Sequence, residues 1–330
     1  MDREIPTITS EGDTRKIGFE LEFAGLGLDE AAEIIQSLYG GKITKTHRYH
    51  YQIAETQLGT FRVELDARIL RKMAGDKTLE KWGLDFKDEQ GNFTIGEIVD
   101  RVAKTVVPIE VVMPPIPMKE TEKLEPLRAA LQEHKAEGTG ASLVHAFGMH
   151  INIECPDLQA ETLLRYLRAF VLLYPWLLKQ LKIDMTRKIT PFVDAFPEKY
   201  VKLILDPLYQ PAADKFMDDY LLHNPTRNRP LDLMPVFAME APEKVQAVLE
   251  DEKNRPRPTF HYRLPNSHID DADWRLADEL EYWMVIERFA AMPEMVNKLS
   301  RLYLLRKRST LVSFRKEWVK ITAILLDLDE

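Results

Sequence analysis

Apolar and polar side chains alternate along several segments of this chain, which is the pattern of β-strands that bury one face. In the segment Lys16 to Ala24, Glu20 and Glu22 share one face and apolar residues occupy the other. Similar sorting predicts further strands, over residues 42–54, 60–70, 107–113, 148–154 and 259–263. Gly59 lies in the short segment between the predicted strands at residues 42–54 and 60–70, and it predicts a hairpin there.

Apolar residues at helical spacing predict helices between the strands. One follows Asp29 as its cap and ends at Gly40-Gly41, another opens with a capping box of Thr94 and Glu97, and a third contains Leu124, Leu127 and Leu131. The polar residues 71–92 predict a long loop or flap, and a helix begins at Cys155-Pro156-Asp157. Nearly everything from there to Glu330 has helical periodicity, apart from residues 258–265. We therefore predict an α+β fold with a mainly antiparallel sheet, helices on one face and a helical C-terminal part.

The polar faces of the strands carry the candidate chemistry. If the strands share one sheet, these faces converge and bring together about six carboxylates or imidazoles with one or more arginines. The candidates on these faces are Glu20, Glu22, Glu64, Asp66, Glu110, His150, His261 and Arg263. Carboxylates crowded in this way require cations, and Mg²⁺ or Mn²⁺ are the natural ligands of such oxygen-rich sites. The pattern thus indicates a site for two or three divalent ions with phosphate nearby.

Each of these segments also has an ordinary structural interpretation. An isolated Glu-x-Glu in a strand is most often a solvated face, and Glu64 and Asp66 are placed to pair with Arg62 and Arg68. His150 is equally well explained as a core histidine bonded to a carbonyl. Glu110 is harder to explain in this way, because its neighbours on both faces of the strand are apolar.

Composition excludes several classes of protein. The chain has 330 residues, a formal net charge of −8 and no dense run of basic residues, which argues against nucleic acid as its main partner. Its most apolar stretch, Leu163 to Leu178, is interrupted by Arg165 and Arg168, so we expect no membrane span. The single cysteine, Cys155, indicates a reducing compartment, and we expect a cytoplasmic protein. No common glycine-rich phosphate loop is present, so any nucleotide must be held by metals and arginines.

Six motifs, taken in order, resemble those of the amidoligase family, a distant relative of glutamine synthetase and glutamate–cysteine ligase. They are GFELEFAGL from Gly18, VELDARIL from Val63, PIEVVMPP from Pro108, GMHINI from Gly148, RNRPLDL from Arg227 and TFHYRLPNSHID from Thr259. The resemblance implies a glutamine synthetase-like sheet and an ATP-dependent carboxylate–amine ligase, which forms an amide bond through an acyl phosphate with Mg²⁺ or Mn²⁺. It implies a single catalytic domain over residues 1–330, with a motif core at 16–287 and a helical extension at 288–330.

The resemblance also assigns roles to individual residues. The metal ligands it implies are Glu20, Glu22, Glu64, Asp66, Glu110, His150 and His261. The catalytic residues it implies are Glu20, Glu22, Glu110, His150 and Arg263, and the residues expected to contact ATP are Arg229, Arg263, His150 and Asn152. The expected partners are a small-molecule or peptide carboxylate and an amine; the sequence does not predict the oligomeric state.

The chain departs from the family pattern at two positions that bear on the metal. His261 stands where the family usually has glutamate, and Asp232 stands where it tends to have asparagine. An imidazole suits Mn²⁺ or Zn²⁺ better than Mg²⁺. Two alternatives to the ligase therefore stay open: a catalytically degenerate member that binds nucleotide or metal, and a metal-dependent hydrolase that uses the same residues.

Overall fold

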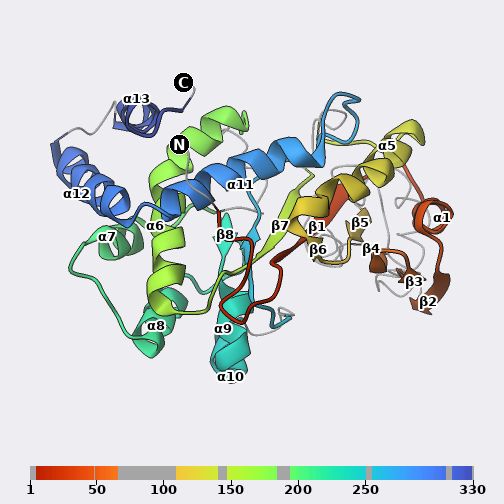
Figure 1. The fold of residues 1–330 in the computed structure, drawn as a ribbon, viewed down its shortest axis with the longest axis horizontal. Coiled ribbons are helices and arrows are strands. Elements are labelled where there is room, and N and C mark those ends of the chain that lie inside the picture. Colours follow the sequence, from red (N-terminus) through yellow and green to blue (C-terminus); the bar gives the residue numbers. More distant parts are fainter. Residues whose placement is uncertain are drawn as a thin grey trace, which may run out of the picture. The chain divides into compact units, whose positions relative to one another are not determined.

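A computed structural model describes the chain over residues 5–47, 49–65, 109–139, 147–183, 194–249, 255–309 and 314–328. Within these residues it is a mixed α and β structure with ten α-helices and a nine-stranded sheet (Figure 1). The chain divides into two compact units. Unit 1 comprises residues 1–17, 150–265 and 277–330, and unit 2 comprises residues 18–149 and 266–276.

The hydrogen-bonded path through the sheet runs β2-β3-β4-β5-β1-β7-β9-β8, and β6 pairs with β1. The strand bounds are β1 Lys16–Phe23, β2 Lys42–His47, β3 His50–Thr56, β4 Gly59–Leu65, β5 Ile109–Val112, β6 Ile116–Pro117, β7 Met149–Glu154, β8 Leu231–Asp232 and β9 Thr259–Tyr262. Every pairing whose register is known is antiparallel, as the sequence predicts. Strands β1 and β7 are common to both units, because the division falls after Ile17 in one and after Met149 in the other.

In unit 2, an amphipathic helix covers the apolar face of the hairpin strands. Helix α1 (Leu28–Tyr39) packs against β3 and β4, and Tyr39 stacks on Phe61 with ring centroids 5.2 Å apart. Phe61, Val63 and Leu65 of β4 are buried, whereas the alternating Arg62 and Glu64 are partly exposed. The apolar and polar faces of β4 are therefore sorted as the two-residue period predicts. The other helices among the described residues of this unit are the 3₁₀ helix η1 Met118–Leu124 and α5 Glu125–Glu133.

In unit 1, the apolar face of β9 packs against two long helices. Phe260 stacks on Tyr166 of α6 (Ala160–Gln180), with ring centroids 4.8 Å apart. Its ring centroid lies 5.6 Å from that of Trp283 of α11 (Leu276–Ala290). Because neighbouring side chains in a strand point to opposite faces, this packing directs His261 away from the helices. Helix α6 also packs against α7, α8, α12 and α13 (Figure 1). The bounds of the other helices are α7 Glu198–Leu205, α8 Ala213–His223, α9 Met234–Glu240, α10 Pro242–Leu249, α12 Pro293–Ser309 and α13 Phe314–Leu326.

A buried ion pair joins the N-terminal segment of unit 1 to its helices. The Arg15 Nη2 atom lies 2.8 Å from the Glu287 Oε1 atom, and both side chains are fully buried. Glu287 also accepts hydrogen bonds from the Tyr166 hydroxyl at 2.5 Å and from the Trp283 indole nitrogen at 2.8 Å. Arg15 donates to the carbonyl of Glu154 at the end of β7. This network holds β7, α6 and α11 together.

Several predicted boundaries are wrong, and each has a local cause. Asp29 does not cap α1, because the helix begins at Leu28, after an extended Gly27. The Asp29 carboxylate instead accepts a hydrogen bond from the Tyr51 hydroxyl. The predicted strand over residues 42–54 is two antiparallel strands, because the chain turns between His47 and His50. The predicted hairpin at Gly59 is confirmed.

The start of α6 is also later than the sequence predicts. Its first residue is Ala160, and the Asp157 carboxylate organises the entry by accepting hydrogen bonds from the Gln159 amide and the Thr162 hydroxyl. Predictions for residues 66–108, which include Asp66, the loop at 71–92 and the capping box of Thr94, lie outside the described residues. Among the described helices, none combines the length and the apolar composition that a membrane crossing requires.

Candidate functional site

A row of three carboxylates crosses adjacent strands of unit 2. Glu110 of β5 lies directly opposite Glu64 of β4 on one side and directly opposite Glu22 of β1 on the other. Residues in register across antiparallel strands have Cα atoms about 4.5–5.5 Å apart and side chains on the same face. We refer to Glu22, Glu64 and Glu110 as the acid row.

The acid row is largely withdrawn from solvent. Glu22 and Glu110 are each only 9% exposed, and Glu64 is partly exposed. Glu22 Oε2 accepts a hydrogen bond of 2.7 Å from the Gly148 amide, which fixes that carboxylate at the start of β7. At the other end of the row, the His50 Nε2 atom lies 3.3 Å from a Glu64 oxygen, so an imidazole extends the row onto β3.

Like charges directly opposite one another destabilise a sheet, and burial raises that cost because a less polar surrounding screens them less. A divalent cation bound to carboxylate oxygens would neutralise the row, and hard ions such as Mg²⁺ and Mn²⁺ prefer these ligands. The donor set therefore fits the cations that the sequence predicts.

A second polar group lies on β8 and β9 in unit 1. Asp232 is in register with His261, and the Asp232 Oδ2 atom lies 3.3 Å from both the His261 Nδ1 atom and the Arg227 Nε atom. Burial by itself raises the pKa of the Asp232 carboxyl, but the hydrogen bond with His261 and the charge of Arg227 lower this pKa overall, below its usual range. Asp232 is thus held as a carboxylate beside the imidazole.

This arrangement orients His261 as a potential metal ligand. When Nδ1 carries the ring proton and donates it to Asp232, Nε2 keeps the lone pair that binds a metal. A histidine that binds a metal commonly donates its other ring N–H to a carboxylate. This hydrogen bond orients the ring and makes the metal-binding nitrogen more basic. The two departures from the family pattern, His261 and Asp232, are therefore in contact and act as a pair.

Three arginines surround the same strands. Arg257 donates from Nε and Nη2 to the Asn152 side-chain oxygen at 3.0 and 2.7 Å, and Asn152 is in register with His261. Arg263, which is 3% exposed, donates to the carbonyl of Arg227 and so lies beside the arginine that pairs with Asp232. Arg227, Arg257 and Arg263 give this part of unit 1 the positive charge that phosphate groups require.

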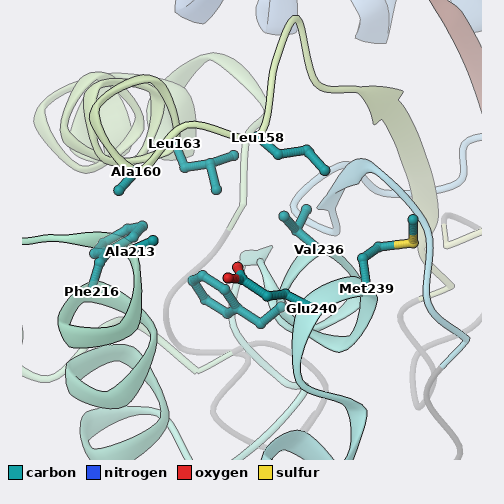
Figure 2. A pocket seen from close by; sticks show the side chains of 9 residues that line it. Leu158, Ala160, Leu163, Ala213, Phe216, Val236, Met239 and Glu240 are labelled. Atoms are coloured by element: carbon teal, nitrogen blue, oxygen red, sulfur yellow. The ribbon is translucent and has the colours of Figure 1, made fainter.

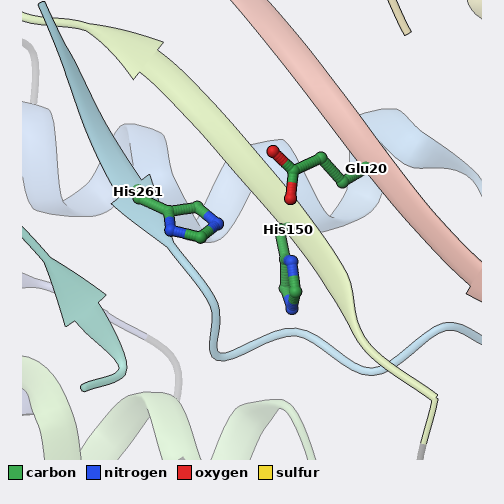
Figure 3. A group of neighbouring side chains, drawn as sticks. All are labelled: Glu20, His150 and His261. Atoms are coloured by element: carbon green, nitrogen blue, oxygen red, sulfur yellow. The ribbon is translucent and has the colours of Figure 1, made fainter. Parts of the chain in front are cut away.

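Two histidine rings of unit 1 lie close together on strands β7 and β9. His150, next to the division in β7, has its ring 5.2 Å from the His261 ring in an edge-to-face arrangement. Figure 3 shows the His150 and His261 side chains on strands β7 and β9. Two imidazoles this close together can serve as a pair of metal ligands.

Other candidates lie in different surroundings. Arg229 is buried, and its guanidinium bonds to the Asn224 side chain and to the carbonyls of Asp194 and Ala195. These bonds serve the fold, and the expected contact with ATP stays a prediction. The Cys155 thiol is buried, and burial raises its pKa well above the usual value, which suits a structural cysteine rather than a nucleophile.

Sequence patterns alone do not identify His50, Arg227 or Arg257 as functional residues. The position of His50 on a polar strand face is the one local indication of a functional role. Its pairing with Glu64 cannot be predicted locally, because it depends on the turn between His47 and His50. Arg227 and Arg257 lie in loops, where no periodic pattern indicates the direction of a side chain.

Comparison with known proteins identifies the family. Residues 13–285 match the model of the family described as "Putative amidoligase enzyme". The matched span covers most of the chain, and the protein belongs to this amidoligase family. Searches of the curated proteins and of the solved structures each find no match.

Proposed function

We propose that this protein is an ATP-dependent carboxylate–amine ligase that requires a divalent metal ion. The observation that carries the proposal is the acid row, in which Glu110 lies between Glu22 and Glu64 on adjacent strands of an amidoligase-family chain. Three neighbouring carboxylates are costly unless they bind cations, and phosphoryl transfer from ATP is a reaction that depends on such cations.

The metal, when bound, supplies charge neutralisation for the phosphates and for the carboxylate that is to be activated. Glu22, Glu64 and Glu110 offer oxygen ligands for it. In unit 1, His150 and His261 offer a second set with imidazole ligands, in which Asp232 orients His261. The imidazoles favour Mn²⁺ at the second set, and oxygen ligands alone favour Mg²⁺ at the first.

The arginines of unit 1 suit the role of phosphate ligands. Arg227 and Arg263 are held in place by their bonds to Asp232 and to main-chain oxygen, so their positions are fixed before a ligand arrives. A preorganised guanidinium next to a transferring phosphoryl group lowers the barrier, because its charge is already oriented. Asn152 is positioned in the same way by Arg257.

The reaction has two displacements. First, a carboxylate oxygen attacks the γ-phosphorus of ATP, the bond to the bridging oxygen breaks, and ADP leaves with that electron pair. An amine nitrogen then attacks the acyl carbon, inorganic phosphate leaves with the former carboxylate oxygen, and the new amide loses a proton to solvent. The substrates we propose are a small-molecule or peptide carboxylate and an amine, and the cytoplasm supplies the ATP.

A direct test measures ADP formation by the purified protein with ATP, Mg²⁺ or Mn²⁺, pooled carboxylates and pooled amines. We expect ADP release that requires the metal, the carboxylate and the amine together. A variant with Glu22→Gln and Glu110→Gln should lose this release, because the metal loses two ligands. Glu33→Gln on the exposed side of α1 makes the same charge change away from the acid row and should keep full activity.

The outcomes distinguish the alternatives. Metal binding without nucleotide affinity would reject the ligase in favour of a metal-dependent hydrolase. Nucleotide and metal binding without ADP release for any pair of substrates would indicate a catalytically degenerate member of the family.

A further inference from the structure

Helix α6 borders two pockets of opposite chemical character within unit 1. The first, of about 370 Å³, is lined mostly by apolar side chains, among which the Glu240 carboxylate is the only charged group (Figure 2). The second, of about 320 Å³, is polar and is bordered by α6, α12 and the segment that precedes α8. Its lining residues are Glu161, Leu164, Arg165, Arg168, Gln210, Pro211, Pro293, Val296 and Asn297. We refer to it as the arginine pocket.

Arg168 brings a buried positive charge to the arginine pocket. The residue is 8% exposed, and its guanidinium donates from Nε to the Ile204 carbonyl and from Nη2 to the carbonyls of Asp206 and Tyr209. None of these bonds uses Nη1. Burial lowers the pKa of Arg168, which is the expected effect when a cation is withdrawn from water. Within the described residues its hydrogen-bond acceptors are main-chain oxygens, and the nearby Asp206 charge opposes the effect of burial on this pKa only in part.

Arg165 adds a second guanidinium on the same face of α6, because residues three apart on a helix are neighbours. Its Nε atom is buried and has no hydrogen-bond acceptor in the described part of the chain. The nearest carboxylate, Glu161, lies 3.9 Å from Nη1, beyond hydrogen-bond distance, and is 90% exposed. An exposed pair of this kind contributes little. A buried donor without an acceptor is costly, and an anionic ligand would remove that cost.

The start of α12 completes the positive surroundings. Pro293 is the first residue of this helix, and Pro293, Val296 and Asn297 all line the arginine pocket. The N-terminal turn of a helix carries partial positive charge. The pocket meets this charge rather than free amides, because proline has no N–H and the Val296 amide donates to the Met292 carbonyl; the same turn also contains Glu294. The Asn297 and Gln210 side chains can provide neutral donors beside the two guanidiniums.

We propose that the arginine pocket binds a small anion that carries a phosphate or carboxylate group. The two guanidiniums and the first turn of α12 supply the charge, and a volume of about 320 Å³ lies within the range of small-ligand sites. Glu161 at the rim is the single opposing charge among the lining residues. The arginine pocket contains neither a residue of the acid row nor His150 or His261. This proposal and the proposed ligase activity can therefore fail independently of each other.

The test is calorimetric titration of the full chain with inorganic phosphate, glycerol 3-phosphate and succinate, at matched ionic strength. The main variant is Arg165→Gln, because Arg165 makes no hydrogen bond on which the described fold depends, whereas Arg168 holds the end of α7. Arg301→Gln, on the exposed surface of α12, is the control with the same change of charge. Asn297→Asp is a second variant, which places a negative charge in the pocket and leaves both arginines intact.

We expect wild-type protein to bind at least one of the three anions and Arg165→Gln to weaken that binding roughly ten- to hundredfold, the effect of losing one charge-assisted hydrogen bond. Asn297→Asp should weaken it as well, and Arg301→Gln should not. Binding of phosphate and glycerol 3-phosphate without succinate identifies a phosphate site, and the reverse identifies a carboxylate site. Absence of binding for all three anions, or equal binding by Arg165→Gln and wild type, would overturn the proposal.

Discussion

Glu110 lies directly opposite Glu22 across strands β5 and β1, so that two nearly buried carboxylates are neighbours in the sheet. Glu64 continues the same row on β4. A protein that only needed a stable sheet would gain nothing from this arrangement, because opposed like charges destabilise the strand pair. We therefore propose that the acid row binds a cation, which would offset the cost of the opposed charges.

The acid row makes a prediction about stability without substrates. Glu110→Gln removes one of the opposed charges, so it should stabilise the metal-free protein by about 0.2–1 kcal/mol. The same variant should gain less stability than wild type when Mn²⁺ is added, because the stabilisation by a bound ligand increases with the logarithm of its affinity for the folded state. Urea denaturation with chelator and with Mn²⁺ measures both effects. Glu33→Gln serves as control, and an unchanged response to Mn²⁺ in Glu110→Gln would count against the metal site.

The contact between His261 and Asp232 predicts a coupled change of metal preference. His261→Glu alone places a second carboxylate beside Asp232, so it should reduce stability and metal affinity together. The double variant with Asp232→Asn removes that repulsion and restores the residues usual in the family, and it should shift preference from Mn²⁺ toward Mg²⁺. Titration of each variant with both metals gives the ratio of affinities. Equal ratios in wild type and double variant would show that His261 does not contact the metal.

The buried network around Glu287 predicts a large loss of stability. Glu287→Gln leaves Arg15 buried without its countercharge, which typically costs about 3–5 kcal/mol. Glu281→Gln changes an exposed residue of the same helix and should alter stability by no more than about 0.5 kcal/mol. Chemical denaturation compares the two. A similar small effect for both variants would mean that the buried pair adds little beyond packing.

Asp219 predicts a pH dependence of stability. Burial raises the pKa of this carboxyl, but hydrogen bonds from Lys215 and Tyr209 lower it overall, below the ordinary value of 3.8. A carboxyl with a lowered pKa in the folded state stabilises the protein above its unfolded pKa, and this contribution is lost as the pH falls through the folded pKa.

Asp219→Asn should accordingly be less stable than wild type near neutral pH, and the difference should shrink below about pH 3.8. Asp218→Asn is the matched control, because Asp218 makes only an exposed ion pair with Lys244. Thermal unfolding across a pH series gives the comparison. A difference between wild type and Asp219→Asn that stays constant with pH would contradict the assigned role of the carboxylate.

The sequence predicted the faces of the strands well, because a period of two residues is a local property. The burial of Glu110 and the opposite faces of Glu64 and Val63 on β4 follow from that pattern alone. The family resemblance placed His150 and His261 among the candidate ligands, and their rings are neighbours on β7 and β9.

The features that sequence could not predict depend on long-range register or on short elements. Strand β8 has two residues, Leu231 and Asp232, too few for any periodicity, yet it places Asp232 opposite His261. The pairing of Glu110 with Glu22 requires β5 to lie beside β1, which no local pattern of either strand contains. The burial of the Arg165 Nε atom without a hydrogen-bond acceptor among the described residues results from packing between segments that are far apart in sequence.

The most direct test of the proposed ligase follows the oxygen of the substrate carboxylate. Pooled carboxylates labelled with ¹⁸O in the carboxyl group are incubated with the protein, ATP, Mg²⁺ or Mn²⁺ and pooled amines, and the inorganic phosphate is analysed by mass spectrometry. Activation through an acyl phosphate predicts one ¹⁸O atom in each phosphate released, both by wild type and by Glu33→Gln. The variant with Glu22→Gln and Glu110→Gln should release no labelled phosphate. Phosphate released without label would show that ATP is hydrolysed by water, which would contradict the ligase.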